Sequence, residues 1–210
     1  MLKKRELKKE QEKFAKKVIT TDNFDDIKLI AGVDQAFIDD KIISGIVVLD
    51  IKTMEIVDKK YAVVETEIPY IPGYMAYREA PAVVEAFHKL TKKPDLLVID
   101  GNGILHPRRI GMATHIGILL DTPTIGVTKS QSIGELKEDT VYVEKEARAK
   151  KIATKEHANP IFISPGHKIS LKTSIEIIKD MMKGHKLPEP LHIAHSYSNK
   201  IKKKLQKKEK

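Results

Sequence analysis

DLLVIDGNGILHPRRIGMATHIGILLDTPTIGVTK, residues 95–129, is the stretch that decides the fold. It starts after Pro94 with a short apolar run that stops at Asp100, and two glycines follow closely. Such a run is typical of a buried strand, and the glycines are typical of a loop that approaches a ligand closely. Residues 111–120 then carry apolar side chains at helical spacing, and residues 123–127 form a second apolar run. The order strand, loop, helix, strand predicts a parallel, right-handed unit whose strands open on one crevice.

Asp100, His106 and Lys129 are predicted to lie on the rim of that crevice. A Gly-x-Gly after a strand also suggests a dinucleotide site, but the third glycine of that pattern falls on His106, and the helix starts several residues too late. We therefore reject a dinucleotide site. An acid at a strand end, with a glycine-rich floor and cationic neighbours, is instead typical of a site for a hard metal ion and phosphate.

The composition is that of a globular chain with excess positive charge. At 210 residues, 41% of them hydrophobic, the chain is long enough for one well-cored domain. We expect residues 1–210 to form that single domain, with a basic N-terminal helix and a basic C-terminal tail. Lys and Arg number 38 against 29 Asp and Glu, a net charge of +9. A polyanionic partner is one explanation, and a solvated, lysine-rich surface suited to heat is the other.

Cysteine and long apolar runs are both missing from the sequence. Without cysteine there are no disulfides and no thiolate zinc sites, and an intracellular location is the default. No run approaches the roughly 18 apolar residues of a membrane-spanning helix. We therefore expect a cytoplasmic protein that does not contact a membrane, and we expect it to be a monomer.

Before the central stretch, the sequence predicts a helix over residues 3–19 and then a group of strands. The strands are predicted over residues 28–37, 42–51 and 55–64. Short polar breaks between them predict antiparallel hairpins. A loop over residues 65–77 follows, and the prolines in its Pro-Tyr-Ile-Pro tip make that tip stiff. An ordered apolar tip in a loop either covers the core or touches a partner.

The remaining elements flank the central stretch on both sides. A helix over residues 78–90, with Pro81 in its first turn, is predicted just before it. The polar residues 131–158 predict a peripheral hairpin or insertion with a brief strand at 141–143. The sequence then predicts a strand at 160–164, a turn at 164–167, a helix at 170–182 capped by Ser170, and a helix at 191–205.

Asp34 interrupts an apolar strand, and a buried carboxylate there needs a partner. One explanation is a carboxylate satisfied by basic side chains or backbone donors. The other is a metal site: if the strand ending at Asp100 lies parallel to the first strand, the two aspartates become neighbours. Two such carboxylates repel each other unless a cation joins them, and oxygen ligands favour Mg²⁺ or Mn²⁺. Glu79 is the natural third acid of this cluster.

Several blocks of sequence carry a family resemblance and stand in order through about residues 30–196. They are AGVD at 31–34, YIPG at 70–73 with YREAP at 77–81, IDGNG at 99–103 with HPR at 106–108, TIGV at 124–127 followed by Lys129, SPGH at 164–167, PEP at 188–190 and AH at 194–195. In these blocks the chain resembles the endonuclease V family. It departs from the family pattern at Thr128, where alanine is more common, and at Leu191-His192, where a threonine-arginine pair is common.

The resemblance implies a fold, a reaction and a cofactor. The fold is ribonuclease H-like α/β, a mixed sheet in which three antiparallel strands are followed by parallel strands, with flanking helices. The implied reaction is a step of DNA repair: Mg²⁺-dependent hydrolysis of the second phosphodiester bond 3′ to a deoxyinosine, with Mn²⁺ as a substitute ion. DNA containing deoxyinosine is then the partner, and inosine in RNA is the alternative substrate.

The resemblance also assigns roles to individual residues. Asp34 and Asp100 hold the metal, and the catalytic site consists of Asp34, Glu79, Asp100, Lys129 and His195. The tip of the loop acts as a wedge that parts the duplex, and it consists of Pro69, Tyr70, Ile71 and Pro72. A pocket for the flipped hypoxanthine base is formed by Gly101, Asn102, Gly103, His106, Gly111 and His115.

Two other classes of function fit part of this pattern. A different nuclease of the same fold, such as a hybrid-cleaving ribonuclease or a resolvase, shares the acidic cluster but needs neither the wedge nor the glycine floor. A nucleic-acid-binding module without catalysis has no use for the three acids. A nicking assay that compares inosine-containing strands with RNA·DNA hybrids distinguishes the first class from an inosine-specific endonuclease. Metal-independent binding without cleavage identifies the second class.

Overall fold

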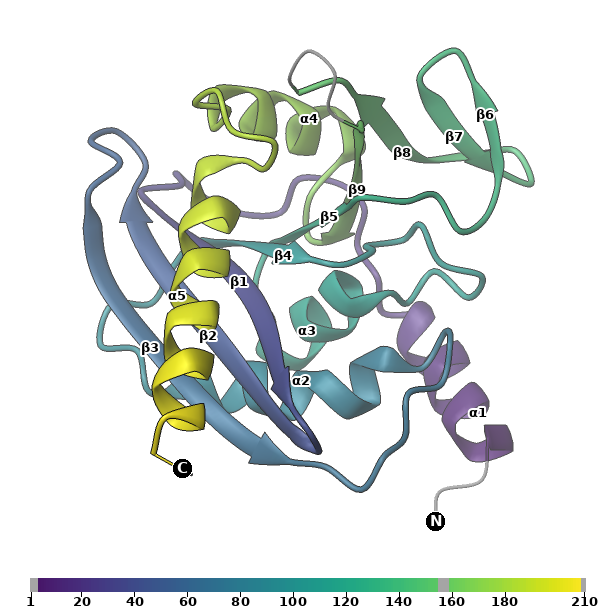
Figure 1. Cartoon of the computed structure of the whole chain (residues 1–210). Helices are drawn as coiled ribbons and strands as arrows, with labels where there is room; N and C mark the ends of the chain where they lie inside the picture. Colours follow the sequence, from purple (N-terminus) through teal and green to yellow (C-terminus); the bar gives the residue numbers. More distant parts are fainter. Residues whose placement is uncertain (1–3, 155–158, 209–210) are drawn as a thin grey trace.

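A nine-stranded mixed sheet organises the part of the chain that the computed structural model describes, residues 4–154 and 159–208. Its strand order is β3-β2-β1-β4-β5-β9-β8-β7-β6, with helices on both faces (Figure 1). None of the helices in these residues has the length and apolar content that crossing a bilayer requires.

The first three strands form the antiparallel meander that the sequence predicts. They are β1 (Leu29–Ile38), β2 (Lys41–Asp50) and β3 (Ile56–Glu65). The tight turn between β1 and β2 has Asp39 in the left-handed region, at φ 47°, a conformation that aspartate tolerates better than most residues. Strand β2 is buried along nearly its whole length, because both of its faces are covered.

The central stretch folds as the predicted parallel unit of β4 (Leu96–Asp100), α3 (Met112–Leu120) and β5 (Thr124–Thr128). Strand β4 also lies parallel to β1, with Val33 opposite Ile99. The next residues along the two strands are Asp34 and Asp100, so this register places the two aspartates side by side where β4 ends. The predicted neighbourhood of the two aspartates is confirmed.

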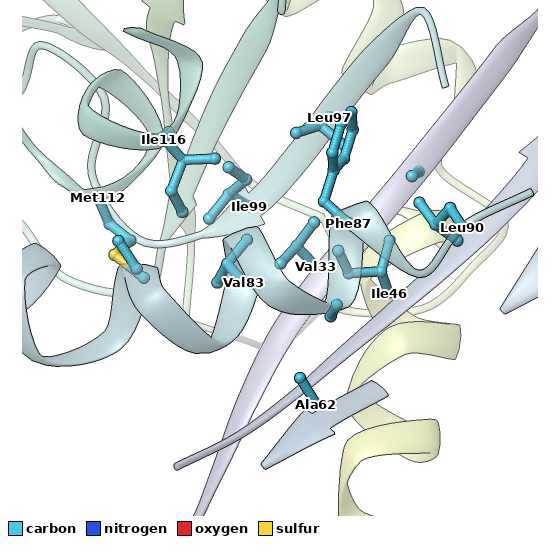
Figure 2. Packing of buried hydrophobic residues seen from close by; sticks show 14 of the residues in the cluster. Val33, Ile46, Ala62, Val83, Phe87, Leu90, Leu97, Ile99, Met112 and Ile116 are labelled. Atoms are coloured by element: carbon cyan, nitrogen blue, oxygen red, sulfur yellow. The ribbon is translucent and has the colours of Figure 1, made fainter. Parts of the chain in front are cut away.

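One face of the sheet is covered by α2 (Met75–His88) and α3. Figure 2 shows the core between these helices and the sheet, where Val33, Ile46 and Ile99 of the strands meet Val83 and Phe87 of α2. Helix α2 begins three residues before the predicted helix, so Pro81 lies beyond its first turn. Glu79 is likewise in the second turn.

The other face of the sheet is covered by α4 (Leu171–Asp180) and α5 (Glu189–Gln206). Ser170 caps α4 as predicted, its hydroxyl accepting a hydrogen bond from the Thr173 amide at 3.1 Å. Helix α5 runs along β1 and β2 (Figure 1). A Cβ at Gly32 would stand 1.8 Å from the Pro190 carbonyl oxygen, so the missing side chain lets the start of α5 press onto β1.

The segment after β5 differs from its prediction in two places. The predicted peripheral hairpin is three strands that extend the sheet: β6 (Glu135–Lys137), β7 (Thr140–Val143) and β8 (Glu146–Ile152). The predicted turn at 164–167 is wrong, because these residues are the second half of β9 (Ile161–His167). Pro165 is tolerated beside a register shift in the β5–β9 ladder, and Gly166 permits close contact with Thr124.

Helix α1 (Lys4–Ala15) packs beside α2 and α3 at the edge of the molecule (Figure 1). Its buried side chains are Leu7 and Gln11. The Tyr77 hydroxyl donates a hydrogen bond to the Leu7 carbonyl at 3.1 Å, and the Phe14 ring meets the edge of the His115 ring. The N-terminal helix is therefore held against α2 and α3 by a few specific contacts.

Candidate active site

Three carboxylates from three separate elements line one open cavity of about 860 Å³. Asp34 comes from β1, Asp100 from the end of β4 and Glu79 from α2. Asp34 and Glu79 are each only 4% exposed, while Asp100 faces more solvent. The fold thus gathers acids that are 45 and 21 residues apart along the chain, at 34, 79 and 100.

Burial and mutual repulsion shift the ionisation of these acids. Burial raises the pKa of Asp34, and the charge of Asp100 raises it further, against the opposing effect of hydrogen bonds from Ser198 and His195. Burial raises the pKa of Glu79 to about 7, with Asp100 and Asp34 adding to the shift and Arg78 opposing it. The three acids therefore resist ionising together, and a bound cation would favour their charged forms.

Asp34 is held by the C-terminal helix. The Ser198 hydroxyl donates a hydrogen bond to Asp34 Oδ2, and His195 Nδ1 lies 3.3 Å from the same oxygen. Asn199 in turn donates to the His195 carbonyl at 2.9 Å and lies 3.2 Å from its Nε2. The sequence prediction included His195 but missed Ser198 and Asn199, although both lie one helical turn after it and so on the same side of α5.

Lys129 lies where the sequence places it, beside Asp100. Its Nζ forms an ion pair with Asp100 Oδ2 at 2.9 Å, and its side chain stays 44% exposed. Lys129 follows the last residue of β5, the parallel neighbour of β4. The predicted rim of acid and lysine is therefore present, with a partly exposed ammonium group at its edge.

The predicted wedge is an exposed loop tip beside the acidic cluster. Tyr70 is 64% exposed, and it lines the cavity together with Pro72. Pro69 and Ile71 belong to the same tip but do not line the cavity. The tip is fixed at both ends, because Arg78 Nη1 donates to the Ile68 carbonyl and the Gly73 carbonyl accepts from Arg108 Nη2 at 2.9 Å.

The predicted base pocket is only partly assembled around the cavity. The members that line it are Gly101, Asn102, His106 and Gly111. Gly103 and His115 do not line it. A Cβ at Gly103 would stand 2.1 Å from the Pro165 carbonyl oxygen, and one at Gly111 would stand 2.3 Å from the Asn102 carbonyl oxygen. These glycines let backbone segments pack closely and so give the cavity its floor.

The two histidines of the predicted pocket differ in their surroundings. His106 Nε2 lies 3.1 Å from the Gly73 carbonyl oxygen, and burial lowers its pKa to about 4. His115 lies under α1, its ring edge-on to those of Phe14 and Tyr77, and burial lowers its pKa to about 4 as well. Both side chains are therefore neutral near pH 7, and His115 acts as packing in this structure.

Gln11 and Arg108 are cavity-lining residues to which the sequence prediction assigned no role. Arg108 Nε donates to Gln11 Oε1 at 2.5 Å, and the guanidinium lies over the Tyr74 ring at 4.6 Å. The sequence does contain a signal for Gln11. It lies four residues after Leu7, and so on the same narrow buried side of a lysine-rich helix.

The acidic cluster fits a hydrated magnesium ion better than a closed metal cage. Among residues 4–154 and 159–208, no three His, Asp or Glu side chains are arranged as a complete metal site. Mg²⁺ is usually bound through one or two carboxylates and keeps several waters and substrate phosphate oxygens. Asp34 and Asp100 supply such carboxylates at an open cavity, so the donor set fits this ion.

A mixed sheet of three antiparallel strands continued by parallel ones, with one acid in the middle of its first strand beside another at the end of its fourth, defines a ribonuclease H-like nuclease. The endonuclease V family model matches residues 12–196. The chain is 41% identical over 198 residues to endonuclease V of Dictyoglomus thermophilum, covering 90% of this chain and 87% of that protein. The chain therefore belongs to the endonuclease V family, and it is an endonuclease that hydrolyses phosphodiester bonds.

Solved structures agree with this assignment. The structure of endonuclease V from Streptomyces avermitilis superposes with a TM-score of 0.91 at 29% identity, covering 98% of this chain and 96% of that one. Endonuclease V from Ciona intestinalis superposes with a TM-score of 0.84 at 30% identity, covering 96% and 98%. That protein was crystallised with a 24mer DNA containing an inosine followed by a ribo-adenosine.

Proposed function

We propose that this endonuclease recognises deoxyinosine in DNA and, with Mg²⁺, cuts the second phosphodiester bond 3′ to it, as a step of DNA repair. The observation that carries the proposal is that a single cavity combines both parts of the site. Asp34, Glu79 and Asp100 line it together with the Tyr70 tip and the glycine-rich floor. A nuclease that cut any strand would need the acids alone. The complex of the Ciona relative with inosine-containing DNA supports the choice of lesion.

The acidic cluster and its cationic neighbour divide the hydrolytic work. Asp34 and Asp100 would hold Mg²⁺, which when bound supplies Lewis-acid stabilisation of charge on the phosphoryl group. Ser198 and His195 orient the Asp34 carboxylate through the contacts described above. Lys129 can leave Asp100 for a phosphate oxygen, because its ammonium group is exposed on a flexible side chain.

The loop tip and the glycine floor divide the recognition work. A base inspected in a pocket must leave the stack, which costs a few kcal/mol, and an apolar side chain inserted in its place offsets part of that cost. Tyr70, exposed on a tip fixed at both ends, suits this role. Hypoxanthine lacks the exocyclic amine of guanine, so a pocket closed by backbone at Gly111 can exclude guanine sterically while bonding the shared edge.

Cleavage of end-labelled strands tests the proposal. The full chain is incubated with Mg²⁺ and matched oligonucleotides that carry inosine or guanine at one position. We expect a cut at the second bond 3′ to inosine, no cut in the guanine strand, and loss of the cut when the ion is chelated. A cut at every position, or one that persists under chelation, contradicts the proposal.

Inosine in RNA is the second candidate substrate. The DNA bound by the Ciona relative carries a ribo-adenosine directly after its inosine, so at least that relative accommodates a ribose there. The same assay with inosine-containing RNA, and with DNA carrying a single ribonucleotide after the inosine, ranks the substrates by kcat/KM.

A further inference from the structure

Gln11 is an unusual residue for its place in the fold. Helix α1 is rich in lysine and glutamate, yet Gln11 is completely buried. A buried amide is costly unless both its donor and its acceptor atoms are paired. In Gln11 both are paired, and neither partner belongs to α1.

The partners of Gln11 come from the two segments that frame the cavity. Gln11 Nε2 donates to the Gly73 carbonyl at 2.9 Å, and Gln11 Oε1 accepts from Arg108 Nε at 2.5 Å. Arg108 Nη2 donates to the same Gly73 carbonyl at 2.9 Å. Gln11, Arg108 and Gly73 thus close a ring of hydrogen bonds between α1, the loop before α3 and the loop tip.

The position of Gly73 gives this ring its consequence. Gly73 directly follows the apolar tip at 69–72, and its φ of +78° is one that other residues rarely adopt. A Cβ there would stand 3.1 Å from Arg108 Nη2, so Arg108 lies against the bare backbone of this turn. The direction in which the tip leaves the turn is therefore set by what holds the Gly73 carbonyl.

We propose that Gln11 is a positioning residue that fixes the tip carrying Tyr70 relative to the base pocket, by donating to Gly73 while holding Arg108 in place. This role rests on the proposed function of the tip as a wedge. Gln11 does not touch the acidic cluster through any of its hydrogen bonds, so its contribution lies in opening a duplex and not in hydrolysis. The N-terminal helix is then part of lesion recognition.

Two substitutions in α1 separate positioning from mere anchoring of the helix. Gln11→Leu keeps the buried volume but removes both hydrogen bonds. Leu7→Ala, one turn earlier on the same buried side, weakens helix packing and leaves the ring of hydrogen bonds intact. KM and kcat are measured with Mg²⁺ on one inosine-containing strand, single or annealed to its complement, together with the Tm of each variant.

We expect Gln11→Leu to raise KM for the duplex about fivefold, which corresponds to the net contribution of roughly one hydrogen bond. For the single strand we expect KM to change by less than about twofold. Gln11→Glu, which keeps an acceptor for Arg108 but cannot donate to Gly73, should behave like Gln11→Leu. Leu7→Ala should lower Tm and leave the ratio of the two KM values unchanged. Equal effects of Gln11→Leu on both substrates, or wild-type behaviour of Gln11→Glu, would overturn the assignment.

Amide hydrogen exchange in the free protein keeps the inference separate from the proposed function. Exchange at residues 68–74 should accelerate in Gln11→Leu but not in Leu7→Ala. Unchanged exchange in Gln11→Leu refutes the positioning role whatever the substrate is. If the wild-type chain leaves inosine-containing strands uncut, the proposed function fails, while the exchange result still decides the role of Gln11.

Discussion

Ser198→Ala is the substitution whose effect on the active site can be worked out most directly. The Ser198 hydroxyl is fully buried and donates to Asp34 Oδ2, and a hydrogen bond to a charged acceptor contributes about 1.5–3 kcal/mol. Removing it leaves Asp34 less well oriented and raises its pKa further, because this hydrogen bond lowers that pKa. At about 1.4 kcal/mol per factor of ten, the loss corresponds to a roughly 10- to 100-fold weaker Mg²⁺ site.

The assay is a titration of cleavage against Mg²⁺ concentration, read as the concentration that gives half-maximal rate. We expect Ser198→Ala to shift this midpoint upward by about tenfold or more, and the shift to narrow as the pH rises and Asp34 ionises. Ser196→Ala, an exposed position on the same helix, is the matched control and should leave the midpoint unchanged. An unchanged midpoint in Ser198→Ala would refute the claim that Asp34 is a metal ligand oriented by α5.

Three further predictions follow from the described contacts. Asp34→Asn or Asp100→Asn should abolish cutting and leave inosine-dependent binding in a gel-shift assay largely in place; full activity in Mg²⁺ would remove these residues from the metal site. Tyr70→Ala should weaken binding of lesion duplexes by more than that of lesion single strands, and equal losses on both would contradict a wedge. Because the pKa of Glu79 is raised to about 7 from an ordinary 4.5, its protonated form is favoured in the folded state, so it contributes stability below pH 4.5 that is lost as the pH rises to 7. Chemical denaturation without metal should show this loss as about 3 kcal/mol, and Glu79→Gln should remove it; the same slope in both proteins would show that Glu79 is not its source.

The pairing of Asp34 with Asp100 was predictable because it depends on local patterns. An apolar run interrupted by an acid, and another that ends at one, both mark strands, and the helix between β4 and β5 requires a parallel connection. The remaining step, that β4 lies beside β1, was a hypothesis, and the structure confirms it. The position of the acidic cluster was therefore accessible from the residues themselves, whereas the ribonuclease H-like fold class was implied by the family resemblance.

The second half of β9 was not predictable in the same way. Ser164-Pro165-Gly166-His167 has the composition of a turn, but its glycine is required for contact with Thr124 and its proline lies beside a bulge. Both reasons depend on a partner strand that is distant in sequence. The same limit applies to β8, where Arg148 is buried because it donates to the His106 carbonyl at 2.9 Å and pairs with Glu146. Local propensity is overridden at both places by tertiary contacts.

The supporting residues of the site were hidden for a related reason. Ser198 and Gln11 are ordinary polar residues on polar helices, and their importance comes from the groups they meet, at positions 34 and 73. His115 shows the opposite case. The resemblance placed it in the base pocket, and the structure packs it between Phe14 and Tyr77. Residue type alone does not separate a binding histidine from a packing one.

The contact between Gly32 and Pro190 has a consequence for how the hydrolytic centre is assembled. Because α5 closes onto β1 and brings Ser198 and His195 to Asp34, the hydrolytic centre joins two segments that are 164 residues apart at Asp34 and Ser198. Those partners reach Asp34 only when this helix is docked on the sheet. Undocking of α5 would therefore strip Asp34 of its partners even in a molecule whose strands stay paired.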